Sequence, residues 1–290
     1  MKLYFILCFL LTLFLCGPAE AGDSQGEQPK RVEIVGYDDD AMEPFISRDG
    51  RFLLFNNLNE PTTNTDIHFA ERKDDWTWLY RGKVKGINTP DLEGCPTMDR
   101  AGRIYFISPR NYPKTLCAIY TGKFKDGQVT DVQIVESISQ KKPGMVNFDV
   151  EVSPDGEMLI FVDSQFKPGS GPQSANLVMA SRDGAGFARL PGSSWLLSPV
   201  NKPDSLQYAP TISSNKLTLY FTRFDRKSDF KAPQIYRAAR PALDAPFGQP
   251  VHLTGLGEYV EGSAFSPDER LLYFHRKDGT KFHLYAIPVR

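Results

Sequence analysis

The sequence lacks the features that mark most cofactor-dependent enzymes and nucleic-acid-binding proteins. Its 290 residues contain 34 Lys and Arg against 35 Asp and Glu, so no excess of positive charge favours nucleic acid as a partner. Only four histidines are present, and none forms a short-spaced pair with another His or with Cys of the kind that zinc sites use. A Gly-x-Ser-x-Gly elbow, a phosphate-cradling loop and a dinucleotide fingerprint are also missing. We therefore expect neither a metal nor a cofactor.

The N-terminus carries a short apolar run, from Leu3 to Cys16. A positive charge precedes it and Ala19-Glu20-Ala21 follows, which is typical of a secretory signal peptide cleaved after Ala21. The run is too short for a comfortable membrane span. Lipidation at Cys16 is disfavoured, because Leu15 stands where that processing needs a small residue. We predict a signal peptide over 1–21, a flexible segment over 22–30, and a periplasmic or secreted protein with no membrane span after cleavage.

Residues 31–290 contain an internal repeat in which a short strand, a tight polar turn and an apolar strand ending in Phe follow one another. Ser and Asp side chains can bond to backbone N–H groups in such turns, and Gly accepts a positive φ at the exit. The turns are Ser47-Arg48-Asp49-Gly50, Asp99-Arg100-Ala101-Gly102, Ser153-Pro154-Asp155-Gly156, Ser213-Ser214-Asn215-Lys216 and Ser266-Pro267-Asp268-Glu269. The Phe anchors are Phe55, Phe106, Phe161, Phe221 and Phe274.

Each repeat predicts a sheet of about four antiparallel strands. The strand after each turn is apolar on both faces, which favours a sheet covered on both sides. Such sheets, recurring along the chain, are typical of an all-β propeller. Residues 32–49 align without a gap to 251–268, so we expect Val32–Val35 to pair with the last blade and close a single domain over 31–290. We predict five blades, with six as the alternative.

The repeat also predicts the state of Cys95 and Cys117, the two cysteines that remain after signal cleavage. Export would permit a disulfide. The repeat, however, places them two strand spacings apart in one sheet, about 10 Å, which is beyond the reach of a disulfide. We expect two unpaired thiols.

The Ser-Pro-Asp-Gly turn before a Leu, Tyr or Phe strand resembles the WD40-like Pro-Asp repeat of the TolB-like β-propeller family, over residues 31–290. The turns at 153–156 and 266–269 match best, and the turn at 213–216 departs by having Asn-Lys in place of Asp-Gly. The resemblance implies that the connection into each first strand and the loop after each second strand lie at one mouth of a central channel. That mouth is the candidate site. Its carboxylates are Glu43, Glu93, Asp149 and Glu261, and its basic residues are Arg110, Arg223 and Arg276.

Two functions fit this mouth. The leading prediction is an exported, monomeric, non-catalytic protein that binds a protein, peptide or glycan partner, because recognisable catalytic motifs are missing. The alternative is a carbohydrate-active enzyme of the glycoside hydrolase kind, whose two acids would come from Glu43, Glu93, Asp149 and Glu261. That alternative requires at least two of these carboxyl groups to meet in one pocket and one of them to have a raised pKa. Ordinary ion pairing of the charged residues is the competing explanation.

Overall fold

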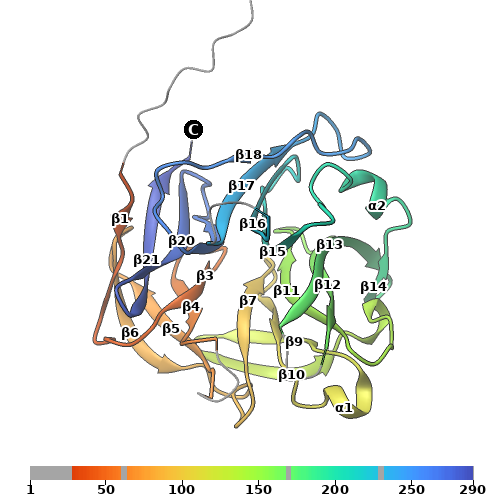
Figure 1. The fold of residues 1–290 in the computed structure, drawn as a ribbon. Helices are drawn as coiled ribbons and strands as arrows, with labels where there is room; N and C mark the ends of the chain where they lie inside the picture. Colours follow the sequence, from red (N-terminus) through yellow and green to blue (C-terminus); the bar gives the residue numbers. More distant parts are fainter. Residues whose placement is uncertain (1–27, 60–63, 168–170, 228–231, 290) are drawn as a thin grey trace, which may run out of the picture.

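The computed structural model describes residues 28–59, 64–167, 171–227 and 232–289, whose regular secondary structure is nearly all β-strand (Figure 1). The predicted signal peptide, 1–21, and most of the segment 22–30 lie outside the described residues. Among the described residues no helix is long and apolar enough to cross a membrane. The helices are α1 (Tyr112–Thr115), the 3-10 helix η1 (Glu136–Ile138) and α2 (Ser193–Leu196).

Antiparallel strands succeed one another outward from a central axis, with β3, β7, β11 and β15 near the middle of Figure 1. One sheet, in the order β2-β6-β5-β4-β3, contains β2 (Glu33–Val35), β3 (Met42–Ile46), β4 (Phe52–Asn56), β5 (Ile67–Arg72) and β6 (Thr77–Lys83). The next, β10-β9-β8-β7, contains β7 (Gly94–Met98), β8 (Arg103–Ile107), β9 (Ile119–Lys125) and β10 (Gln128–Ile134).

Two further units are joined by one parallel bridge between Ala175 and Leu206, so they form a continuous eight-stranded sheet. The first unit has β11 (Met145–Val152), β12 (Met158–Phe166), β13 (Pro172–Asp183) and β14 (Gly186–Arg189). The second has β15 (Ser205–Ile212), β16 (Thr218–Asp225), β17 (Gln234–Ala239) and β18 (Val251–His252). The remaining sheet, β1-β21-β20-β19, has β1 (Lys30–Arg31), β19 (Val260–Phe265), β20 (Leu271–Asp278) and β21 (Lys281–Pro288).

The N-terminal segment joins the last sheet to the first. Strand β1 pairs antiparallel with β21, so the predicted contact between the two ends of the domain is present. The predicted register is wrong, however, because Glu33–Val35 does not continue beside β21 but pairs in parallel with β6. The crossover occurs at Val32, which is buried and donates its N–H to the carbonyl of Leu284 (2.8 Å).

The turns have the chemistry that the sequence predicts. In the turn at 153–156, the Ser153 hydroxyl donates to Asp155 Oδ1 (2.6 Å) and accepts the N–H of Met158 (2.9 Å). The same pair of bonds recurs at Ser47, Ser213 and Ser266. The exit residue has a positive φ in every turn, including the non-glycine residues Lys216 and Glu269. These turns therefore lock each first strand to its second strand in one geometry.

The Phe anchors form the core between neighbouring sheets. All of them, Phe55, Phe106, Phe161, Phe221 and Phe274, are fully buried. The buried clusters of the described residues link the second strands in a ring: β4 with β8, β8 with β12, β12 with β16, β16 with β20, and β20 with β4. Burial on both faces explains why these strands are apolar throughout. The ring positions the inner strands around one axis.

Candidate functional site

Each inner strand contains a β-bulge at the same place. The strand register shifts within β3, β7, β11, β15 and β19, where they pair with their second strands. At each shift one residue has a left-handed backbone: Glu43 (φ 48°), Cys95 (51°), Asp149 (45°), Ala209 (47°) and Gly262 (61°). This conformation costs a non-glycine residue about 1–2 kcal/mol and is kept only where the surroundings impose it. The bulges bring these residues to one central pocket, which all five line.

Side chains of neighbouring strands support several of these strained residues. The N–H of Cys95 donates to Asn56 Oδ1 (3.0 Å), that of Gly262 to Thr222 Oγ1 (3.2 Å), and that of Glu43 to His275 Nδ1 (3.1 Å). Asn56, Thr222 and His275 each follow a Phe anchor directly. We call this place the post-anchor position.

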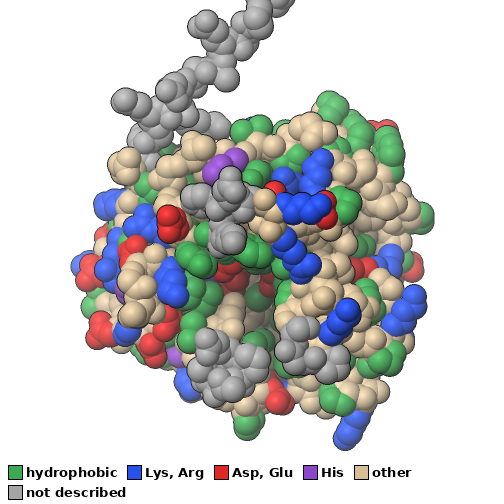
Figure 2. Space-filling model, viewed as in Figure 1, with side chains coloured by type: hydrophobic (Ala, Val, Ile, Leu, Met, Phe, Trp, Pro, Cys, Tyr) green, Lys and Arg blue, Asp and Glu red, His purple; other side chains and the backbone are tan. Residues whose placement is uncertain are grey.

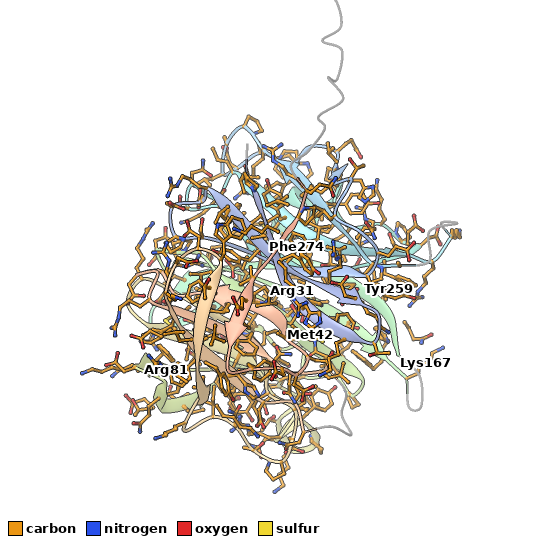
Figure 3. All side chains as sticks on the ribbon, turned by 90° about the vertical axis from the view of Figure 1, so that its left-hand side faces the viewer. Arg31, Met42, Arg81, Lys167, Tyr259 and Phe274 are labelled. Atoms are coloured by element: carbon orange, nitrogen blue, oxygen red, sulfur yellow. The ribbon has the colours of Figure 1, made fainter. Side chains whose placement is uncertain are left out.

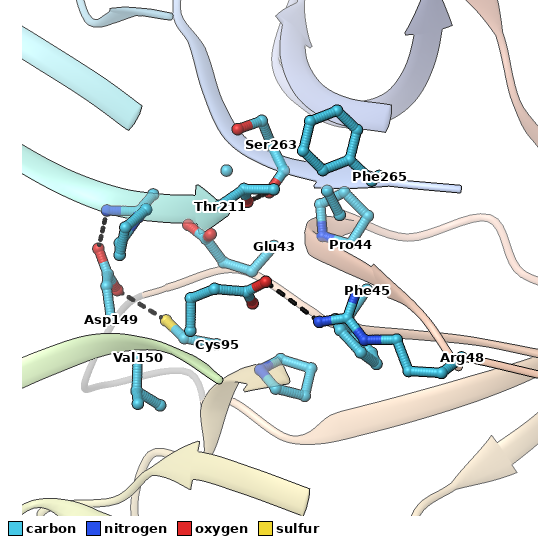
Figure 4. Close-up of a pocket in the computed structure, with 16 residues that line it drawn as sticks. Glu43, Pro44, Phe45, Arg48, Cys95, Asp149, Val150, Thr211, Ser263 and Phe265 are labelled. Carbon is cyan, nitrogen blue, oxygen red and sulfur yellow. Dashed lines mark hydrogen bonds and ion pairs between the residues drawn. The ribbon is translucent and has the colours of Figure 1, made fainter. Parts of the chain in front are cut away.

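At Ala209 the support has a different origin. The residue after Phe161 is Val162, which has no side-chain acceptor. The N–H of Ala209 donates instead to Asp149 Oδ2 (2.9 Å), and the thiol of Cys95 donates to Asp149 Oδ1 (2.9 Å) (Figure 4). Asp149 is therefore held from both sides by residues of neighbouring bulges, and its carboxylate has a fixed place at the axis.

Three predicted carboxyl groups meet at this centre. Glu43 and Asp149 are only 9% and 6% exposed and line the same cavity, whose volume is about 30 Å³. Glu261 precedes Gly262 in β19 and accepts hydrogen bonds from the hydroxyl of Tyr208 and from His275 Nε2 (3.2 Å). A Cβ on Gly262 would lie 2.5 Å from Glu43 Oε2, so the missing side chain makes room for the Glu43 carboxyl group.

Burial and mutual repulsion set the protonation of these groups. Burial raises the pKa of Glu43 well above its usual value, and the carboxylates of Asp149 and Glu261 raise it further. Burial also raises the pKa of Asp149 to about 6, although the hydrogen bonds from Cys95 and Ala209 oppose this shift. Burial and repulsion therefore favour the protonated form of Glu43, while Asp149 is mostly ionised at neutral pH. Burial and the charge of Glu261 raise the pKa of Tyr208, so this phenol remains a hydrogen-bond donor.

The centre lies beneath a hollow. Figure 2 shows this hollow near the middle of one face, with acidic side chains at its floor. In the side view of Figure 3, Tyr259 and Lys167 lie toward that face and Arg81 lies away from it. Tyr259 precedes inner strand β19 and Lys167 follows second strand β12. The two kinds of connection thus share one side, as the predicted strand polarity requires.

Glu93 does not belong to this centre, although it was predicted as a candidate. It is fully buried and accepts hydrogen bonds from the Thr89 backbone and hydroxyl and from Ser108 Oγ (2.7 Å). It also forms an ion pair with Arg110 (3.2 Å). Every oxygen of this carboxylate is therefore used to hold the connection between β6 and β7, which is the ordinary ion pairing that the sequence left open.

The basic residues predicted at the channel mouth also have structural roles outside the centre. Arg110 lies over the ring of Tyr120 (4.9 Å), Arg223 over that of Tyr236 (4.6 Å) and Arg276 over that of Tyr285 (3.8 Å). The guanidinium groups also donate to backbone carbonyls of neighbouring segments. None of the three lines the central cavity formed by the described residues. Stacking and capping, rather than ligand binding, account for their contacts.

Three residues at the centre were not predicted from the sequence as site residues: Cys95, Tyr208 and His275. Both Cys95 and Cys117 are free thiols. In three inner strands a Pro directly follows the bulge residue: Glu43-Pro44, Cys95-Pro96 and Ala209-Pro210. This repetition is the one sequence signal that could have located the bulges.

Within the part of the chain that the structure describes, no group of three His, Cys, Asp or Glu side chains is arranged to hold a metal ion.

Comparison with known proteins identifies the fold. No protein-family model and no curated protein matches the chain. A solved structure described as a glycoside hydrolase is similar over 90% of this chain and 91% of its own, with a TM-score of 0.60 and 12% identity. An α-L-arabinofuranosidase from Podospora anserina, in complex with cellotriose, is similar over 91% and 96%, with a TM-score of 0.58 and 9% identity. A putative TolB from Agrobacterium tumefaciens is similar over 86% and 74%, with a TM-score of 0.50 and 13% identity.

These similarities show a β-propeller fold. They do not show membership of the WD40-like family, since no family model matches. The leading functional prediction, a non-catalytic interaction protein, is wrong: of the similar structures that span nearly the whole of both chains, one is described as a glycoside hydrolase and another as an α-L-arabinofuranosidase. It relied on missing local motifs, whereas the acids of this centre come from β3, β11 and β19, which are far apart in the sequence.

Proposed function

We propose that this protein is a glycoside hydrolase whose acid and base are carboxyl groups of the central cluster Glu43, Asp149 and Glu261. The observation that carries the proposal is the convergence of three carboxyl groups from three inner strands, two of which, Glu43 and Asp149, have pKa values raised by burial. Two carboxyl groups held in different protonation states are what glycosidic bond cleavage requires. The glycoside hydrolases among the similar structures support carbohydrate as the substrate class.

The roles follow from the protonation states. Burial raises the pKa of Glu43 well above its usual value, so this residue is suited to protonate the oxygen of the leaving sugar as general acid. Asp149 is ionised above about pH 6 and is suited to be the base or the nucleophile. The cavity beside both residues has a volume of about 30 Å³, which is enough to hold water, the second reactant of hydrolysis.

The architecture and location are part of the same proposal. The ring of core clusters and the regular spacing of the turns support five blades, with the N-terminal segment binding both the last and the first. Export by the predicted signal peptide would place the enzyme in the periplasm or outside the cell, where polysaccharides are accessible. N-terminal sequencing of the native protein should then begin at Gly22.

The test is hydrolysis by the purified protein of a panel of plant and bacterial polysaccharides and aryl glycosides. For the substrate that is cleaved, Glu43→Gln should lower kcat about 10²- to 10⁴-fold, because the amide cannot donate the acid's proton. A dinitrophenyl glycoside of the same sugar, whose leaving group needs no protonation, should restore most of this loss. Asp149→Asn should lower kcat for both kinds of substrate.

The matched control is Asp131→Asn, which removes a carboxylate on the outer strand β10. Asp131 is exposed and paired with Lys123 (3.0 Å), so its replacement should leave kcat unchanged. The proposal is rejected if no substrate of the panel is cleaved, or if Glu43→Gln and Asp149→Asn retain the activity of the control.

A further inference from the structure

Three different residue types occupy the post-anchor position, and each makes the same contact with a bulge residue. Asn56 and Thr222 each accept the N–H of a bulge residue through a short, neutral side chain. His275 does the same for Glu43 through Nδ1 (3.1 Å). Since an amide or a hydroxyl oxygen is sufficient elsewhere in the ring, supporting the bulge does not require an imidazole.

His275 differs from the other two in having a second polar atom at the far end of its ring. Its Nε2 lies 3.2 Å from Glu261 Oε2. Because Nδ1 accepts the Glu43 N–H, a neutral ring must carry its proton on Nε2, and it then donates to Glu261. The side chain is fully buried and packs edge-on against Phe282 (5.5 Å between ring centroids), which fixes its orientation.

We propose that His275 is a positioning residue that holds the Glu43 backbone and the Glu261 carboxylate in a fixed relation, through Nδ1 and Nε2 respectively. It does not touch the substrate itself. The catalytic meaning of this inference rests on the proposed function, whereas the two hydrogen bonds and the position of the ring proton do not.

Three substitutions separate the two contacts. His275→Asn places an amide oxygen where Nδ1 lies and keeps the support of Glu43, as Asn56 does for Cys95, but it loses the contact with Glu261. His275→Gln places an amide N–H near the position of Nε2 and keeps the contact with Glu261. His275→Phe keeps the ring and loses both contacts.

For the substrate found with the panel, we expect kcat to fall about 10- to 100-fold in His275→Asn and His275→Phe, as for loss of a hydrogen bond to a charged group. KM should change less than about twofold, because His275 makes no contact with substrate. His275→Gln should recover part of kcat. His275→Asn should unfold at nearly the wild-type urea concentration, which separates positioning from loss of stability.

The control is His252→Phe, which replaces a histidine on the outer strand β18 that stacks on Tyr236 (5.1 Å). It should leave kcat unchanged. Independently of activity, ¹⁵N NMR of the wild-type ring should show the proton on Nε2 of His275. The inference is overturned if the proton is on Nδ1, or if His275→Asn has wild-type kcat. If the wild-type protein cleaves nothing, the proposed function fails and the NMR result alone decides the arrangement of His275.

Discussion

The turns follow the inner strands and the bulges lie within them, yet turns and bulges use repetition differently. In the turns the side chains recur: in four of the described turns a Ser hydroxyl donates to an Asp or Asn and accepts a backbone N–H. In the bulges the left-handed backbone recurs but the side chain does not, because the residue that adopts this backbone is Glu, Cys, Asp, Ala or Gly. The repeated chemistry therefore builds the scaffold, and the residues that differ from repeat to repeat supply the candidate chemistry.

Two aspartates illustrate the difference. In the turn at 266–269, the Ser266 hydroxyl and Arg270 lower the pKa of Asp268 to about 2. In the bulge of β11, burial raises the pKa of Asp149 to about 6. Ionised Asp268 thus favours the folded state, whereas ionised Asp149 opposes it. A strained, buried acid that costs stability is expected at a functional site, and a stabilising acid is expected in a scaffold.

The largest effect should come from Asp149→Asn. Because the folded state holds the Asp149 proton more tightly than the unfolded chain, its contribution to stability falls as the pH rises from about 4 to about 6. The free energy of unfolding of Asp149→Asn should therefore rise relative to wild type across this range, by up to about 3 kcal/mol. Urea unfolding of both proteins from pH 4 to pH 7 measures this difference. A difference that does not change with pH would contradict the assigned environment of Asp149.

A smaller effect is expected from Ser153→Ala in a turn. This change removes the acceptor of the Met158 N–H and the donor to Asp155 from a fully buried side chain. It should lower the free energy of unfolding by about 1–2 kcal/mol. Since Ser153 belongs to the scaffold, kcat should stay at the wild-type value when measured well below the melting temperature. A loss of kcat comparable with that of Glu43→Gln would contradict the assignment of the turns to the scaffold and of the bulges to the candidate site.

The same distinction explains how much of the molecule the sequence could predict. The Ser and Asp residues of the turns and the Phe anchors are local signals with a fixed chemistry, and each turn joins a first strand to an antiparallel second strand as predicted. The register of the N-terminal strands was not, because a two-residue strand such as β1 contains almost no pairing information. The gap-free alignment of 32–49 with 251–268 could not show that the chain crosses to β6 after Val32.

The candidate site was predictable only in part. Glu43, Asp149 and Glu261 were found because carboxylates stand out in inner strands, but Glu93 could not be separated from them without its contacts to Thr89, Ser108 and Arg110. The left-handed backbone at Asp149 has no sequence signal, since Val150 rather than Pro follows it and neighbouring sheets impose the conformation. His275 has no nearby His or Cys in the sequence, and its two contacts are with residues of other strands.

The smallest effect should come from Asp268→Asn, and its sign is opposite to that of Asp149→Asn. Ionised Asp268 adds stability that is fully present above the unfolded pKa near 4 and is lost as the pH falls through about 2. Its side chain is about half exposed, so solvent screening should keep this contribution below about 1 kcal/mol. Wild type should exceed Asp268→Asn in stability at pH 5 and lose this advantage near pH 2. The same sign for both aspartates would contradict the opposite pKa shifts assigned to the turn and to the bulge.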